Sequence, residues 1–158
     1  MPNRSAARYP LTVEPALVIG YGNPLRSDDG VGPVVVRGLD PAAGDAATEA
    51  IQLLPEHIEA VARAGLVVLV DAGVDLEPGD VRCRPVEAPS TSGTAVDLHE
   101  LSPESLVTAA RDLYGRCPAV WAVTVGAADL GFGEGLSPVV EAAIDRARAA
   151  VAALLDNR

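Results

Sequence analysis

Short unbroken apolar runs alternate with amphipathic segments along this chain. The apolar runs cover residues 16–20 (ALVIG), 66–70 (LVVLV) and 119–125 (AVWAVTV). Runs of this length are typical of strands in a parallel sheet, and the first two indicate strands covered on both faces. We predict a strand at each run, with an interior position for residues 16–20. A further strand is predicted at residues 48–53.

Helical spacing of apolar residues appears between these runs. The expected helices cover residues 31–39, 55–64 and 103–114, and a last helix begins at Ser137-Pro138. Ser102 is a suitable N-cap for the third helix, Pro103 fits its first position, and Gly115 supplies its end. The last helix carries a single apolar stripe. Its members are Val140, Ala143, Ile144, Ala147, Val151 and Leu154.

Residues 80–86 (DVRCRPV) alternate in polarity and contain Pro85, which indicates an exposed edge strand. Residues 88–97 are small and polar, so we predict a mobile loop there. Strands that alternate with helices predict an α/β fold: a single three-layer α/β/α domain with a twisted, mostly parallel sheet, one edge strand and helices on both faces. A chain of 158 residues is long enough for one such domain. We assign it to residues 16–158, preceded by a flexible leader at residues 1–15.

Charge and composition exclude several classes of partner. The 12 basic and 22 acidic residues give a formal charge of −10, without a basic cluster. This balance argues against nucleic acid and anionic membrane surfaces as partners. The apolar runs are too short to span a bilayer, and the N-terminus lacks the apolar core of a secretory signal, so we expect a cytoplasmic protein. The two cysteines, Cys83 and Cys117, are far apart, which favours reduced structural thiols.

Two adjacent acids follow the first strand, in the stretch GYGNPLRSDDGVG at residues 20–32. Gly20 and Gly22 resemble the start of a dinucleotide-binding fingerprint, but Leu25 occupies the position of its third glycine. One of the acids, Asp28 and Asp29, can cap the helix that follows. Because neighbouring carboxylates raise each other's pKa and repel phosphate, the pair favours a cation or a metal-bearing partner over a nucleotide.

A third acid, Asp71, directly follows the apolar run at residues 66–70. Ligands of open α/β sheets bind at the carboxyl ends of strands, so Asp71 and the acidic loop are expected to converge there. Asp71 is equally consistent with a turn before Ala72-Gly73. Of the two histidines, His57 lies near the start of a predicted helix, where an exposed or capping role is favoured. His99 follows the predicted loop; it is either a solvated side chain or a third member of the site.

The stretch at residues 20–32 resembles the signature of the hydrogenase maturation endopeptidases. These enzymes trim the C-terminal extension from the large subunit of nickel-iron hydrogenases. The signature fixes the G-x-G-N, the leucine, the paired acids and the following glycines in register. Further similar positions are Gln52-Leu53, Pro55-Glu56, Asp71-Ala72, Pro78-Gly79, His99 and Gly135-Leu136-Ser137-Pro138. The segment Gly126-Ala127-Ala128-Asp129 departs from the family pattern, which implies a different substrate-facing wall.

The resemblance implies that Asp29, Asp71 and His99 contact nickel and carry the catalysis, with Asp28 orienting Asp29. One imidazole and two carboxylates suit a borderline divalent ion such as nickel or zinc. The implied partner is the immature large subunit, which brings the nickel, so the enzyme alone is expected to be metal-free. Either the metal acts as a Lewis acid, or it positions the substrate while an aspartate serves as general base. The alternative function is a non-catalytic nickel sensor or carrier that binds the same precursor.

Overall fold

The computed structural model describes residues 14–90, 99 and 101–158, and its centre is a five-stranded sheet. The strands are β1 (Ala16–Tyr21), β2 (Ala46–Ala50), β3 (Leu66–Gly73), β4 (Val81–Pro85) and β5 (Ala119–Gly126). Their order in the sheet is β2-β1-β3-β5-β4, and β4 alone of these five runs antiparallel to its neighbour. The predicted mostly parallel sheet, with an edge strand near residues 80–86, is therefore confirmed.

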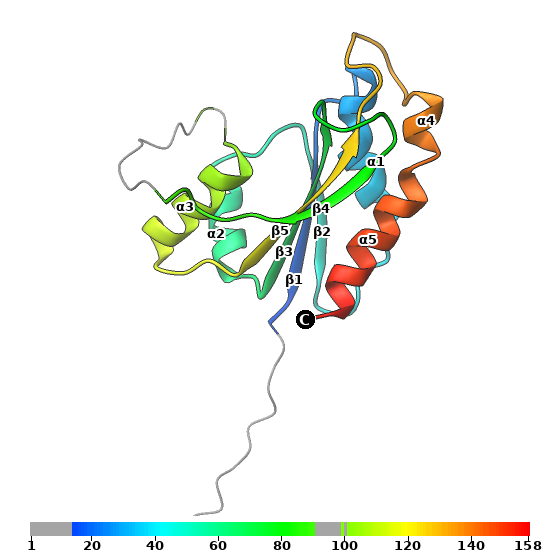
Figure 1. Ribbon diagram of the computed structural model, residues 1–158. Helices are drawn as coiled ribbons and strands as arrows, with labels where there is room; N and C mark the ends of the chain where they lie inside the picture. The colour runs from blue at the N-terminus through cyan, green and yellow to red at the C-terminus, as the bar shows by residue number, and fades with distance from the viewer. Residues whose placement is uncertain (1–13, 91–98, 100) are drawn as a thin grey trace, which may run out of the picture.

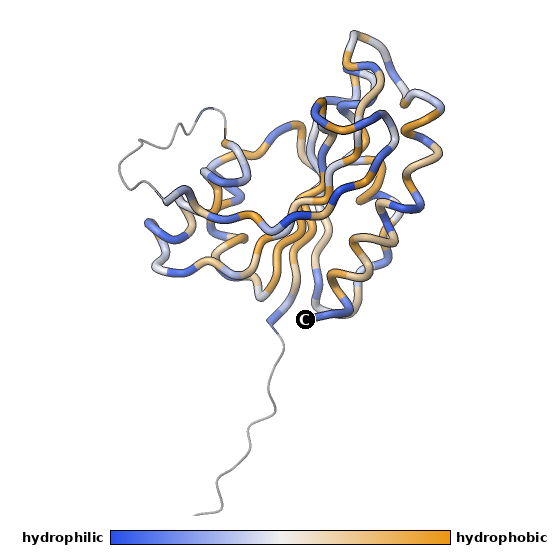
Figure 2. The backbone as a smooth tube through the Cα atoms, in the orientation of Figure 1, coloured by the Kyte–Doolittle hydropathy of each residue, from blue (hydrophilic) through white to orange (hydrophobic). Residues whose placement is uncertain are grey.

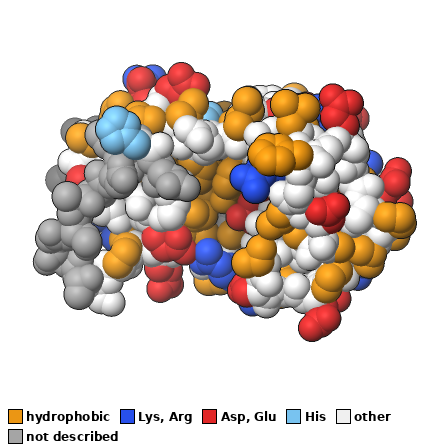
Figure 3. All heavy atoms as spheres, turned by 90° about the horizontal axis from the view of Figure 1, so that it is seen from above, with side chains coloured by type: hydrophobic (Ala, Val, Ile, Leu, Met, Phe, Trp, Pro, Cys, Tyr) orange, Lys and Arg blue, Asp and Glu red, His pale blue; other side chains and the backbone are white. Residues whose placement is uncertain are grey.

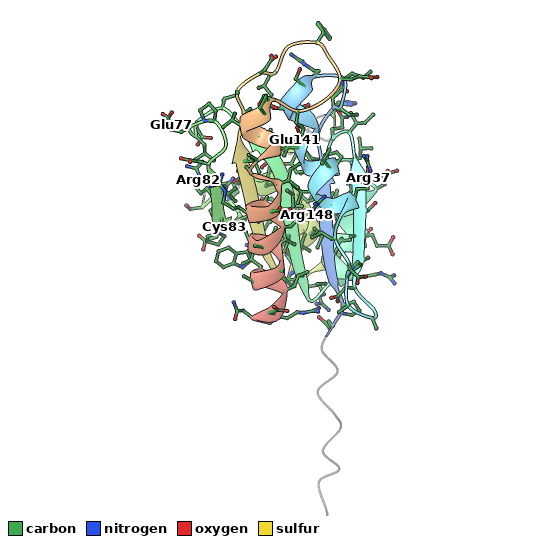
Figure 4. All side chains as sticks on the ribbon, turned by 90° about the vertical axis from the view of Figure 1, so that its right-hand side faces the viewer. Arg37, Glu77, Arg82, Cys83, Glu141 and Arg148 are labelled. Carbon is green, nitrogen blue, oxygen red and sulfur yellow. The ribbon has the colours of Figure 1, made fainter. Side chains whose placement is uncertain are left out.

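Helices cover both faces of the sheet (Figure 1). They are α1 (Val31–Arg37), α2 (His57–Arg63), α3 (Pro103–Tyr114), α4 (Pro138–Glu141) and α5 (Ile144–Asp156), with a short 3-10 helix, η1 (Ser27–Gly30), ahead of α1. The α2 and α3 helices lie on one face, and α1 and α5 lie on the other. In Figure 4, α1 and α5 lie side by side. Arg148 of α5 donates hydrogen bonds to the carbonyls of Val34 and Val35 near the end of α1.

Two apolar clusters fill the space between the layers. Side chains alternate across each strand, so Ile19 and Leu69 face α2 and α3, while Val18 and Val68 face α1 and α5. All four are buried. Burial of a side chain of this size contributes roughly 1.5–3 kcal/mol, which accounts for the unbroken apolar runs in the sequence. Figure 2 shows these runs as hydrophobic segments at the centre of the fold.

Most predicted boundaries agree with the structure. Ser102 caps α3 by accepting a hydrogen bond from the Ser105 amide, and Gly115 ends this helix with a φ of 70°. The second strand covers Ala46–Ala50 and not residues 48–53 as expected. Leu53 lies in the turn after β2, and this turn buries its side chain against α2 and α3. The expected last helix is divided into α4 and α5, and its apolar stripe continues across the break.

Some sequence-based predictions lie outside the described residues. These are residues 1–13 of the leader and residues 91–97 of the loop predicted at 88–97. Cys83 and Cys117 are both free thiols, as expected. In the part of the chain that the structure describes, every helix is too short or too polar to cross a membrane.

Candidate functional site

The loop that follows β1 folds back over the carboxyl ends of β1 and β3. Gly22 has a φ of 141°, and a Cβ atom there would collide with the Asp29 carbonyl oxygen. A Cβ atom at Gly32 would collide with the Val70 carbonyl oxygen in the same way. These close approaches require glycine, because η1 and α1 lie directly against the strand ends. They fix the position of Asp29, the third residue of η1.

Asp28 is fully buried and serves as a hydrogen-bond acceptor for the segment between β5 and α4. Its Oδ2 accepts from the amides of Ala128 and Asp129, each at 2.9 Å, and from the Ser137 hydroxyl at 2.8 Å. Its Oδ1 accepts from the Ser137 amide at 2.7 Å. These four donors come from residues about a hundred positions away in the sequence. Asp28 therefore connects the loop after β1 to the segment between β5 and α4.

The surroundings of Asp28 overturn two expectations. Burial acts to raise the pKa of its carboxyl, but the hydrogen bonds from Ser137, Asp129 and Ala128 outweigh burial and lower the pKa. The predicted mutual raising by the adjacent acids is therefore wrong for Asp28. Neither acid caps α1, because the N-cap position is Gly30 and the helix has no side-chain cap.

Asp29 and Asp71 lie near each other at the carboxyl edge, as expected from the strand ends. Asp29 is half-buried, and its Oδ2 accepts a hydrogen bond of 2.7 Å from the Asn23 amide. Asp71 lies on β3, opposite Thr124 of β5. Tyr21 donates a hydrogen bond to Asp71, and the next residue, Gly22, lies directly against Asp29, so the two acids are neighbours. Two carboxylates from different elements are thus gathered at one place.

Two hydroxyl groups orient the Asp71 carboxylate. The Tyr21 hydroxyl donates to Oδ2 at 2.9 Å, and the Thr124 hydroxyl donates to Oδ1 at 2.8 Å. Burial is the main cause that raises the pKa of Asp71, and these two donors and the Arg84 charge act against it. Burial and the Asp71 charge also raise the pKa of Tyr21, so its phenol remains a donor at neutral pH.

Sequence reasoning missed Tyr21 and Thr124, although a signal for both was present. Each follows, at a spacing of two, an apolar residue of the face toward α2 and α3: Ile19 on β1 and Ala122 on β5. Asp71 has the same relation to Leu69 on β3. Strand periodicity would therefore place these three polar side chains in one row across the sheet. Such a row marks where the apolar core ends and the site begins.

Arg84 adds a positive charge near this row. It lies on β4 and forms an ion pair of 2.9 Å with Glu104 at the start of α3. Figure 3 looks down on the carboxyl ends of the parallel strands and shows a hollow between two raised parts of the surface. Acidic, basic and hydrophobic side chains gather around the hollow.

The histidines have different surroundings. His57 is the first residue of α2, and its Nδ1 accepts a hydrogen bond of 2.9 Å from the Leu54 amide ahead of the helix. The N-cap of α2 is Glu56 and no side chain caps the helix, so the capping role expected for His57 is not found. His99 is exposed. Among the described residues, no three His, Cys, Asp or Glu side chains are grouped so as to hold a metal ion. The site of Asp29, Asp71 and His99 therefore stays a prediction.

The fold and the paired carboxylates define a class of single-domain α/β proteins with an acidic site at the carboxyl edge of the sheet. Solved structures of hydrogenase maturation proteases have a similar fold. The hydrogenase maturating endopeptidase HybD from E. coli is 25% identical, with 90% of this chain and 93% of that chain covered and a TM-score of 0.75. The chain is similar in fold to these maturation endopeptidases, the family whose signature its residues 20–32 resemble.

Two archaeal structures share the fold. The [NiFe] hydrogenase maturation protease HycI from Thermococcus kodakarensis is 23% identical, with a TM-score of 0.67 and coverage of 90% of this chain and 93% of that chain. A hydrogenase 2 maturation peptidase from a Thaumarchaeota archaeon is 24% identical, with a TM-score of 0.65 and coverage of 92% and 100%. No family model and no curated protein matches the sequence.

Proposed function

We propose that this protein is an endopeptidase that removes the C-terminal extension of a nickel-loaded [NiFe] hydrogenase large-subunit precursor. The observation that carries the proposal is the proximity of Asp29 and Asp71, which come from separate elements to the carboxyl edge of the sheet. The fold shared with HybD supports the same reaction class. The peptidase activity follows from both together, since fold alone does not define function.

The nickel ion belongs to the substrate in this proposal. Two carboxylates supply only part of a coordination sphere, which fits a metal that arrives with ligands of its own. Asp29 and Asp71 provide oxygen ligands from the protein, and His99 is the proposed nitrogen ligand. Recognition of the metal then places the scissile peptide bond beside the two acids.

Hydrolysis requires a base for the attacking water and an acid for the leaving amine. An aspartate takes the proton from the water as its oxygen attacks the carbonyl carbon, and the proton then passes to the amine nitrogen as the C–N bond breaks. Such acid–base catalysis contributes about 10²–10⁴ in rate. Placement of the bond contributes about 7–11 kcal/mol, so positioning is the larger effect. A metal ion at this place would supply Lewis-acid polarisation of the carbonyl.

The test is to incubate the protein with a nickel-loaded, C-terminally extended large subunit and follow the mass of that subunit. We expect loss of one C-terminal peptide. Asp29→Asn and Asp71→Asn should each abolish trimming and leave the fold intact, and His99→Ala should cause a large loss. Asp112→Asn, which changes an exposed acid of α3, is the matched control and should trim at the wild-type rate.

The outcomes separate the two candidate functions. Trimming at the wild-type rate by either site variant would remove that acid from the catalytic site. A stable complex with an uncut precursor would support the alternative, a nickel sensor or carrier. The endopeptidase proposal would then be wrong, although the precursor would remain the partner.

A further inference from the structure

The segment between β5 and α4 carries an exposed aromatic side chain at the carboxyl edge. Phe132 is 93% exposed and is the single phenylalanine of the chain. The guanidinium of Arg26 lies 5.6 Å from the centroid of its ring. Leu25, the preceding residue of the acidic loop, is 57% exposed. We refer to Leu25, Arg26 and Phe132 as the prong.

The backbone beneath the prong is held by hydrogen bonds between the two loops. The Gly133 amide donates to the Leu25 carbonyl, and the Ser27 amide donates to the Gly133 carbonyl, each at 2.9 Å. The Ser27 hydroxyl donates to the Gly131 carbonyl at 3.1 Å. Ser27 has a φ of 51°, a conformation that costs a non-glycine residue energy and that these contacts maintain. The exposed ring is therefore carried on an ordered support.

Two further exposed apolar side chains lie at the same edge of the sheet. Val74 is 79% exposed and follows β3, and Ile51 is 67% exposed and follows β2. Together with Leu25 and Phe132, they lie in the loops after all four parallel strands, at the same edge of the sheet.

We propose that the prong is a docking element that inserts into an apolar pocket on the folded large-subunit precursor. The inference rests on the proposed function, because it assigns the prong to the substrate of that same site. Leu25 is only four residues from Asp29, so a protein whose cleavage site reaches Asp29 also covers the prong. Aromatic and arginine side chains dominate binding energy at protein interfaces, and an ordered support lowers the entropy lost on binding. A precursor large enough to carry nickel at one point and contact the prong at another fits both features.

The test measures trimming kinetics of Phe132→Ala on the nickel-loaded precursor. We expect KM to rise about 10–30-fold with kcat unchanged, because the ring contributes to binding and does not touch the reacting bond. Phe132→Leu should recover part of the affinity. The matched control is Leu113→Ala, which removes a side chain of 67% exposure near the end of α3 and should leave KM unchanged.

Direct binding of the precursor gives a second measurement. Phe132→Ala should weaken the complex by the same factor and leave the melting temperature unchanged, because the ring is exposed. If the wild type trims and Phe132→Ala has the wild-type KM, the docking inference is wrong and the proposed function stands. A fall in kcat at constant KM would also contradict docking. If the wild type neither binds nor trims, the proposed function and the inference both fail.

Discussion

Asp28 and Asp29 are neighbours in sequence with separate roles in the structure. Asp28 is buried and accepts four hydrogen bonds from the segment between β5 and α4. Asp29 is half-buried beside Asp71 at the open end of the sheet. The first acid therefore stabilises the site, and the second is available for its chemistry.

This division predicts that the same substitution destabilises the fold much more at Asp28 than at Asp29. Asp28→Asn should lower the free energy of unfolding by roughly 2–4 kcal/mol, because an amide NH₂ group faces backbone donors that then lose their acceptor. Asp29→Asn should change the unfolding free energy by less than about 1 kcal/mol, since water reaches its side chain. Urea unfolding of both variants measures this difference. Equal effects would contradict the assignment of Asp28 as the structural acid.

The difference between the wild type and Asp28→Asn should also depend on pH. The folded-state pKa of Asp28 is lowered, so its stabilising contribution is complete above the ordinary aspartate pKa of about 3.9 and is lost as pH falls through the lower folded value. The two unfolding free energies should therefore converge below about pH 4. A gap that widens in acid would show that the carboxylate form is not the stabilising one.

For the individual residues of the site, part of the arrangement could be predicted from the sequence. The proximity of Asp29 and Asp71 follows from strand ends that share one edge of a parallel sheet. The role of Asp28 as a buried hydrogen-bond acceptor could not be predicted, because its donors lie 100 to 109 residues away in the sequence. Only the folded chain brings these donors to Asp28. His99 follows residues 91–98, which lie outside the described part of the chain. Its ligand role stays a prediction.

The close packing of α1 against β1 determines the position of the loop that carries Asp28 and Asp29. Gly20 of β1 faces Gly32 of α1, and a Cβ atom on either residue would collide with backbone. The two glycines permit helix and strand to approach more closely than side chains would allow. The glycines of the G-x-G and G-V-G parts of the motif are therefore needed for close packing of helix and strand. They do not form a phosphate-binding loop of the kind that such glycines suggest.

Gly32→Ala should thus displace η1 from β3 and separate Asp29 from Asp71. We expect a loss of about 1–3 kcal/mol in unfolding free energy and a large loss of trimming. Gly38→Ala, at the end of the same helix, is the control. Its Cβ atom would meet the guanidinium of Arg148 and weaken the hydrogen bonds to Val34 and Val35, so we expect a loss of about 1–2 kcal/mol with trimming at the wild-type rate. Denaturation and the mass-based trimming assay measure both. Equal effects of the two variants on trimming would contradict the packing argument.

The helix boundaries show what local sequence determines. The α3 boundaries follow from Ser102, Pro103 and Gly115, whose effects act within a few residues. The break between α4 and α5 has no such signal, because apolar residues continue through it. Val140 and Ala143 are both buried against the sheet, so tertiary packing keeps the stripe in place across the break.

For the whole molecule, the alternation of strands and helices predicted the layers but not the order of strands. The order depends on which strand pairs with which, and nothing local in the sequence encodes the central position of β3. A second long-range feature is an ion pair near the C-terminus. Asp45, whose side chain is 4% exposed, pairs with Arg158 and accepts a hydrogen bond of 2.8 Å from the Ala16 amide.

This contact joins the start of β1, the start of β2 and the end of the chain. Asp45→Asn should lower the unfolding free energy by roughly 1.5–3 kcal/mol, since a charged hydrogen-bond acceptor is removed from a buried position. Glu59→Gln breaks the exposed pair between Glu59 and Arg63 and should cost less than about 0.5 kcal/mol. Thermal unfolding distinguishes the two. A similar small shift for both would show that the Asp45 pair is screened by solvent.

The buried position of Asp28 has a consequence for how such genes are classified. Under the proposed function, selection for folding would retain the first acid of the motif, and selection for trimming would retain the second. A relative that kept the first acid and lost the second would be a well-folded pseudoenzyme. If the proposed function holds, the second acid is the position to inspect before activity is assigned to a related sequence.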